Sequence, residues 1–311
     1  MPKLKRERTA PFITSNESVR TIMLDVLIAL LPALAWAVYT YGLAAIKLVA
    51  VSVGVSVACD LVMSLIVRKR LGVTDLSALV TGVVLAFTLP YDAPVYVAAA
   101  GAAFAIIVAK GAFGGLGKNL LNPALCGRVF VHFAFGAQVN TAELARGTDV
   151  LDTLRAGDIP DVHFVDMFMG DMGGAMGEIS ALLLLAGGVY LILRGTSDWR
   201  ISAAFIASAG VMAYLLCPHY DKVSWVLGQV FAGAFMLGAL FMIAEPASSP
   251  VTPVAKLVYG AVGGALVIVF RMYLPISDGV YFAILAANVL ARPIEELALP
   301  SRNMAGKKRN K

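Results

Sequence analysis

Charged residues are scarce in this sequence, and cysteine and histidine are scarcer still. Only 14% of the 311 residues are charged, whereas 59% are hydrophobic and the mean hydropathy is +0.81. Soluble domains carry roughly 25% charged and about 45–50% apolar residues, so a water-soluble core could not bury this excess. The composition therefore predicts an integral membrane protein whose outward-facing side chains are solvated by lipid.

The few cysteines and histidines exclude the usual metal and redox motifs. Cys59, Cys126 and Cys217 form no CxxC pair, and the three histidines lie far apart. No combination has the spacing of a zinc, haem or iron–sulfur site. Because no Ser/His/Asp set has a usable spacing either, we expect neither a bound metal nor hydrolytic catalytic residues.

Ten apolar segments approach the length of a membrane span, which needs about 20 residues. The one long polar connection, 138–174, lies between the fifth segment and the sixth. The sequence thus predicts an all-α membrane protein of two five-helix halves. The ten segments lie near 21–41, 43–67, 75–90, 95–110, 121–137, 176–194, 200–217, 223–244, 256–270 and 279–294. The expected parts are an N-terminal segment 1–20, a first membrane half 21–137, a loop 138–175, a second half 176–294 and a basic tail 295–311.

Lysine and arginine divide unevenly between the two sets of connections. If the N-terminus is inside, nineteen of the 25 fall on the cytoplasmic side and four on the opposite side. Positively charged connections stay in the cytoplasm during insertion. We therefore expect both termini to be cytoplasmic and the long loop to lie outside. The net charge of +5 then reflects topology, and it indicates no nucleic-acid partner.

Two stretches repeat one pattern at an offset of 156 residues. GVVLAFTLPYDAPV (82–95) and GALFMIAEPASSPV (238–251) share a glycine, two prolines and a valine in register. Because each half would hold an odd number of spans, the two halves must insert in opposite orientations. This is an inverted repeat, a fold that places binding sites near the membrane midplane at interrupted helices. Chance matching in apolar sequence is the alternative explanation.

Further echoes of the repeat involve polar residues. Asn122 and Arg128 of the fifth segment correspond to Asn288 and Arg292 of the tenth. The Asn122–Pro123 pair would interrupt its helix at a point where protein can satisfy the freed backbone groups. The sequence KNLLNPALCGRVF (118–130) is therefore expected to help build a central cavity.

Ionisable residues within apolar segments are candidates for function, because charge is costly at membrane depth. Asp25 and Glu178, which also correspond in the repeat, could form an ion path. Arg128 would suit an anionic group such as a cofactor phosphate. Asp60 and Glu245 lie near segment ends, where helix capping or a side chain reaching toward water explains them equally well.

Six motifs in this order resemble a known family across nearly the whole chain. They are PFITSNESVRTIMLDVLIALLPA, TDLSALVTGVVLAFTLP, GGLGKNLLNPALCGRVF, MGEISALLLLAGGVYLI, EPASSPVTP and DGVYFAILAANVLARPIE. The family is that of RnfD, from Rnf-type ion-translocating electron-transport complexes, and of NqrB, from sodium-pumping NADH:quinone reductase.

The resemblance implies a membrane component of a complex that couples electron transfer between ferredoxin and NAD to Na⁺ or H⁺ translocation. It implies a ten-span inverted repeat similar to urea channels, in a bacterial or archaeal cytoplasmic (inner) membrane. It also implies partner proteins of the same complex: RnfA and RnfE in the membrane, RnfG with flavin, and RnfB and RnfC with the iron–sulfur and NADH sites.

The family also implies flavin. Members carry FMN linked through its phosphate to a threonine of an S/T-G-A-T motif in the outside loop, and a second, non-covalent flavin would lie in the bundle. This chain reads ARGTDVL at 145–151. A gap-free alignment puts Asp149 at the flavin position, and a shift of one residue makes Thr148 the attachment site. The alternatives are a scaffold protein without covalent flavin and a redox-inactive transporter or channel of the same fold.

Overall fold

Every regular element that the structure describes is a helix. The structure is a computed structural model, and it describes residues 18–68, 75–112, 119–139, 150–160, 164–169, 175–177, 180–274 and 278–299. The predicted all-α fold class is therefore confirmed. The long helices are α1 (Val19–Tyr41), α2 (Leu43–Met63), α10 (Trp199–Leu216), α13 (Pro253–Tyr273) and α14 (Val280–Ala298). The shorter ones are α3 (Ser77–Phe87), α4 (Val95–Phe104), α5 (Pro123–Ala134), α9 (Ala181–Leu193), α11 (Lys222–Phe231) and α12 (Phe235–Leu237).

Three helical segments widen into π-helix. They are η1 (Ser64–Arg68) after α2, η3 (Ala105–Gly111) after α4, and η4 (Gly238–Met242) after α12. Two small helices, α7 (Val150–Ala156) and α8 (Phe164–Met169), belong to the predicted outside loop and pack on α11. π-Helical turns are uncommon and often accompany functional sites.

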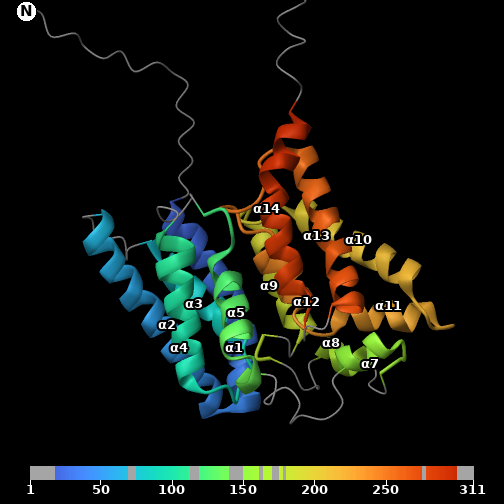
Figure 1. The fold of residues 1–311 in the computed structure, drawn as a ribbon, viewed down its shortest axis with the longest axis horizontal. Helices are drawn as coiled ribbons and strands as arrows, with labels where there is room; N and C mark the ends of the chain where they lie inside the picture. The colour runs from blue at the N-terminus through green and yellow to red at the C-terminus, as the bar shows by residue number, and fades with distance from the viewer. Residues whose placement is uncertain are drawn as a thin grey trace, which may run out of the picture.

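The two halves of the chain form two helical groups that lie side by side. Figure 1 shows α1 to α5 in blue to green on one side and α9 to α14 in yellow to red on the other. In the first group α2 packs on α3 and α4, and α4 packs on α5; in the second, α10 packs on α11 and α13, and α13 packs on α14. The groups meet through α1 with α9 and α5 with α14.

The predicted segments all contain helix, but several helices are shorter than expected. Four helices of the described chain are long and apolar enough to cross a membrane, or five if the bent pair Lys222–Phe231 and Phe235–Met242 counts as one. This pair bends by 64°, so the predicted eighth segment, 223–244, is an interrupted helix, as the repeat pattern had indicated. Gly233 makes the break with a φ of +62°, a conformation that glycine adopts without strain.

Glycines allow two pairs of helices to approach at backbone distance. On α13, a Cβ atom added to Gly264 would collide with the carbonyl oxygen of Phe205 on α10, and one added to Gly260 would collide with that of Ile201. Between the halves, Gly187 of α9 lies against the carbonyl oxygen of Ala29 on α1 in the same way. Small residues at such contacts let helix backbones pack closely in membranes.

Candidate functional site

Asn122 joins the two halves of the protein where α5 begins. Its Oδ1 accepts hydrogen bonds from the amides of Ala124 and Leu125, at 3.0 and 3.3 Å, and so caps the helix. Pro123 follows at the first helical position, where its missing N–H is not needed. The Nδ2 of Asn122 donates to the carbonyl oxygen of Met242 at the end of η4, 3.3 Å away.

Asn288 of α14 completes this junction from the other half. Its Oδ1 accepts a hydrogen bond from the backbone amide of Asn122 at 3.0 Å, and its Nδ2 donates to the Tyr259 hydroxyl of α13 at 2.6 Å. Both asparagines are at least 95% buried. Buried amides are retained when their polar atoms are paired, and here the pairing joins four helical segments, namely α5, η4, α13 and α14.

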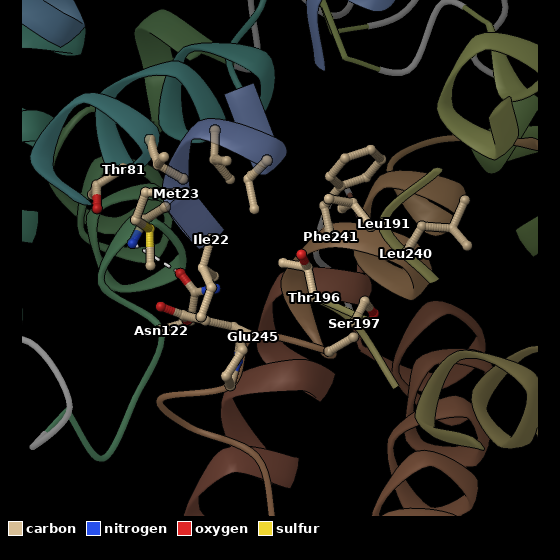
Figure 2. Close-up of a pocket in the computed structure, with 16 residues that line it drawn as sticks. Ile22, Met23, Thr81, Asn122, Leu191, Thr196, Ser197, Leu240, Phe241 and Glu245 are labelled. Carbon is tan, nitrogen blue, oxygen red and sulfur yellow. Dashed lines mark hydrogen bonds between the residues drawn. The ribbon is translucent and has the colours of Figure 1, made fainter. Parts of the chain in front are cut away.

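A pocket opens beside Asn122, between the two halves. It encloses about 580 Å³ of space, part of it open to solvent, and receives side chains from α1, α3, α5, α9 and η4. Figure 2 shows Ile22, Met23 and Asn122 on one side, facing Leu191 and Phe241 on the other. An apolar cleft with a few polar groups is the common composition of cofactor sites.

The pocket also has polar groups in its lining. Thr81, Thr196, Ser197 and Glu245 join Asn122 in the lining. The Ser197 hydroxyl is buried and has no hydrogen-bond partner within the described residues. A buried hydroxyl without a partner is unfavourable, and it marks a point where a bound molecule could supply one.

The break between α11 and α12 is held by a buried ion pair. The Nε of Arg271 lies 3.0 Å from Oδ1 of Asp278, and both side chains are less than 10% exposed. Arg271 also donates to the carbonyl oxygens of Gln229 and Ala232, at 2.6 and 2.9 Å. Asp278 accepts from the amides of Ala234 and Val280, so the groups freed by the break are paired.

A second buried ion pair lies in the first half. The Nζ of Lys110, on η3, is 2.9 Å from Oδ1 of Asp60 on α2, and each side chain is 1% exposed. The sequence had placed Lys110 in a cytoplasmic connection and offered capping as one explanation for Asp60. The structure instead buries both. Neither buried pair could be recognised from sequence, because the partners lie on different helices or are separated by a loop.

Arg128, the predicted anion-binding residue, is buried at the α5–α14 contact. Its guanidinium lies over the Tyr281 ring, 5.1 Å from the centroid. The side chains of His132, Asp278 and Phe282 also lie around Arg128, and the space between them is too small for a water molecule. The structure therefore packs Arg128 against an aromatic ring and shows, among the described residues, no room for an anionic group beside it.

Asp25, the predicted ion-path residue, is buried in α1 and paired with the end of α9. Its carboxylate lies 3.2 Å from Nε of Arg194 and accepts from the hydroxyls of Tyr190 and Thr196. The structure does not place Asp25 with Arg128, because the two belong to separate clusters. Thr148 and Glu178, the other predicted site residues, lie outside the described residues.

The chain matches the model of the NQR2, RnfD, RnfE family over residues 7–303. The chain belongs to this family. It is 39% identical over 296 residues to the D component of the Na⁺-translocating ferredoxin:NAD⁺ oxidoreductase complex of Acetobacterium woodii, and the match covers 92% of this chain and 91% of the relative. The resemblance found in the sequence motifs is thereby confirmed.

The names of other relatives refer to other translocated ions, or to none in particular. The D component of the ion-translocating oxidoreductase complex of Stutzerimonas stutzeri is 33% identical over 94% of this chain and 95% of its own length. The D component of the proton-translocating ferredoxin:NAD⁺ oxidoreductase complex of Clostridium ljungdahlii is 28% identical, with 94% of each chain covered. The relatives therefore include components of both Na⁺- and H⁺-translocating complexes.

Proposed function

We propose that this protein is the RnfD component of an Rnf-type complex that couples electron transfer between ferredoxin and NAD to the translocation of Na⁺ or H⁺. The observation that carries the proposal is near full-length similarity to relatives with that name, one of them 39% identical over 296 residues. The buried junction at Asn122 and the adjoining pocket give the chain a central site of the kind that such a component requires.

The central experiment measures both halves of this activity in one preparation. The complete complex, purified and inserted into lipid vesicles, should reduce NAD with reduced ferredoxin and accumulate an ion on one side. Vesicles with a complex lacking this chain provide the control. Electron transfer without ion movement in the wild-type complex would contradict the proposal.

The proposed fold is a ten-span inverted repeat with both termini in the cytoplasm of a bacterial or archaeal cell, divided into the parts expected from the sequence. The packing order of the helices supports it, since in the first half the second helix packs on the third and fourth, and the fourth on the fifth, and the second half shows a similar order. Asn122 and Asn288, which correspond in the repeat, also meet. Cysteine labelling of intact cells at Thr40 and Leu193 tests the orientation, because only Thr40 is expected near the outer surface.

Covalent FMN at Thr148 remains part of the proposal. The nearest described element is α7, which begins at Val150 and packs on α11 and α13. Ultraviolet fluorescence of the denatured protein, after co-expression with a flavin transferase, tests the link. A fluorescent band that disappears in Thr148→Ala supports attachment there. A dark wild-type band would support the scaffold alternative.

We further place the second, non-covalent flavin in the pocket beside Asn122. The apolar faces of Leu191 and Phe241 suit a ring system, and the unpartnered Ser197 hydroxyl suits a ring heteroatom. Bound there, flavin would supply one- or two-electron chemistry within the membrane. Leu191→Trp, which fills the pocket, should abolish release of flavin on denaturation. Leu193→Trp is the matched control, since Leu193 is 82% exposed.

Asp25 and Glu178 remain the proposed ion-path carboxylates. Asp25→Asn or Glu178→Gln should slow ion uptake by vesicles more than electron transfer. Because Asp25 is already paired with Arg194, Arg194→Gln distinguishes a structural contribution from a transport role. Unchanged ion uptake in both carboxylate variants would remove them from the path.

The expected partners are RnfA, RnfE, RnfG, RnfB and RnfC, so co-purification with them is a further test.

A further inference from the structure

A stripe of buried polar side chains runs along one face of α2 and continues into η1. Ser52, Ser56, Asp60 and Ser64 follow one another at every fourth position, and each is at most 1% exposed. Residues four apart lie on the same helix face, and twelve residues of helix span about 18 Å. In a helix of otherwise apolar residues, a polar face turned inward indicates a path for ions or protons.

Asp60 lies within this stripe and is connected through Lys110 and Ser77 to Asp75. Its Oδ1 is 2.9 Å from Nζ of Lys110. Lys110 donates to the Ser77 hydroxyl at 2.7 Å, and that hydroxyl donates to Oδ1 of Asp75 at 2.7 Å. Asp75 is half-buried just before α3. The chain therefore leads from an accessible carboxylate to a fully buried one, and no donor–acceptor distance along it exceeds 2.9 Å.

The Asp60–Lys110 pair is less completely hydrogen-bonded than its counterpart in the second half. Lys110 and Arg271 both end the fourth membrane helix of their half. Arg271 and Asp278 use their polar atoms in hydrogen bonds to one another and to backbone groups. Neither carboxylate oxygen of Asp60 has a hydrogen bond of good geometry within the described residues, although Lys110 is close.

Two hydroxyls beside Asp60 are also without partners in that part of the chain. They are those of Ser56 and Ser64, one turn to either side and fully buried. A buried ion pair with few supporting hydrogen bonds gains little over its neutral form. A lysine ammonium can serve as a proton donor in catalysis, whereas an arginine guanidinium does not release its proton. The chemistry of a relay is therefore available to the first-half pair and not to the second-half pair.

We propose that Asp75, Ser77, Lys110 and Asp60 form a proton relay into the first half of the membrane domain. The Lys110 ammonium passes a proton to Oδ1 of Asp60, leaving a neutral amine and a carboxylic acid. Asp75 first takes up a proton from water. The Ser77 hydroxyl then gives its own proton to the Lys110 amine and takes this one from Asp75, so that the net result is one proton moved from water to Asp60 at the buried end of the relay.

This relay rests on the proposed function, and it specifies the proton as an ion that this protein moves. Its test uses the complete complex in lipid vesicles, with NAD reduction, a pH-sensitive dye and ²²Na⁺ uptake measured together. Asp60→Asn should strongly lower proton movement per electron, because an amide cannot accept the proton that the carboxylate takes from Lys110. Electron transfer should continue at a rate near that of the wild type.

Substitutions at Lys110 and Asp60 distinguish a proton relay from an ion pair that only stabilises the fold. Lys110→Arg keeps the charge but cannot release its proton, so it should block proton movement, whereas Asp60→Glu should restore much of it. Asp198→Asn is the matched control, because Asp198 pairs with Lys256 at 2.8 Å in the second half. Asp60→Asn combined with Lys110→Met removes both charges and keeps the complex testable if the single variant does not fold.

The outcomes distinguish the two proposals. Failure of the wild-type complex to move any ion contradicts the proposed function. Wild-type proton movement that persists in Asp60→Asn overturns the relay alone. If Asp60→Asn loses ²²Na⁺ uptake while its proton movement is unchanged, the relay is also overturned, because the path would then carry sodium. Normal proton movement in Lys110→Arg would show that the pair is purely structural.

Discussion

The backbone amide of Asn122 donates to the Oδ1 of Asn288 at 3.0 Å, so residues 166 positions apart in the chain join the two helical groups. Asn288 in turn donates to the Tyr259 hydroxyl at 2.6 Å. Because both asparagines are buried, their polar groups depend on one another for hydrogen bonds. The junction therefore positions α5, α14 and the adjoining pocket together.

Loss of the Asn288 amide should destabilise this junction. Asn288→Ala leaves the Asn122 amide and the Tyr259 hydroxyl without their partner, and each buried polar group left unpaired costs about 1–3 kcal/mol. Thermal unfolding in detergent measures the effect. Thr40→Ala removes an exposed hydroxyl that bonds only within its own helix and should change stability little. Equal effects of the two substitutions would contradict a joining role for Asn288.

The Arg271–Asp278 pair should be essential to the bent helix. Asp278→Ala leaves a buried guanidinium without its carboxylate and the Ala234 amide without an acceptor. Breaking a buried pair on one side costs about 3–5 kcal/mol, so poor folding or a large fall in unfolding temperature is expected. The pair of Asp152 and Arg155 is more exposed, at 56% and 28%, and serves for comparison. Asp152→Ala leaves the bond from Arg155 to the Arg271 carbonyl oxygen in place and should cost no more than about 1 kcal/mol.

Adding a methyl group at the α10–α13 contact should be unfavourable. Gly264→Ala would push the added Cβ into the carbonyl oxygen of Phe205, and overpacking of this kind costs about 1–3 kcal/mol. Gly210→Ala on α10 is the control, because a Cβ there meets nothing within 4 Å. That substitution should be neutral or stabilising by about 0.5–1 kcal/mol, since alanine favours helix. Chemical denaturation in detergent distinguishes the two signs.

Asp198 should give a pH-dependent contribution to stability. Burial opposes its ionisation, but hydrogen bonds from the Lys256 ammonium and the Arg200 amide outweigh this and lower the pKa of Asp198 below 3.8. A carboxyl group with a lowered folded-state pKa contributes stability above its unfolded pKa and loses it as pH falls through the folded value. The difference in unfolding temperature between wild type and Asp198→Asn should be constant near neutral pH and shrink below about pH 4.

The interrupted helices show how far the sequence could predict this fold. The glycine and proline pattern marked the eighth segment as an interrupted helix, and the structure shows it bent by 64°. The apolar run VFAGAFML (230–237) contains no proline, so the sequence did not show at which residue the break would fall. The bend occurs at Gly233 because Arg271 and Asp278, far away in sequence, pair with the backbone groups that the bend releases.

In the candidate site, too, the sequence identified some residues, whereas their partners became known only from the structure. Asn122 and Arg128 were recognised from the motif KNLLNPALCGRVF, and Asp25 from its place in an apolar segment. The partners that define their environments, such as Tyr281 over Arg128 and Arg194 beside Asp25, come from other helices. Sequence spacing identifies residues on one helix face, but it cannot say which other helix will lie against that face.

The sequence by itself determined that this protein lies in a membrane, that its elements are helices, and to which family it belongs. Those properties follow from composition, from apolar runs and from motifs that are each local in the chain. Only the tertiary structure decided that Asp60 pairs with Lys110, that Arg271 holds the helix break and that Asn122 meets Asn288. Buried polar groups must find partners wherever packing brings them together, and packing is a property of the whole fold.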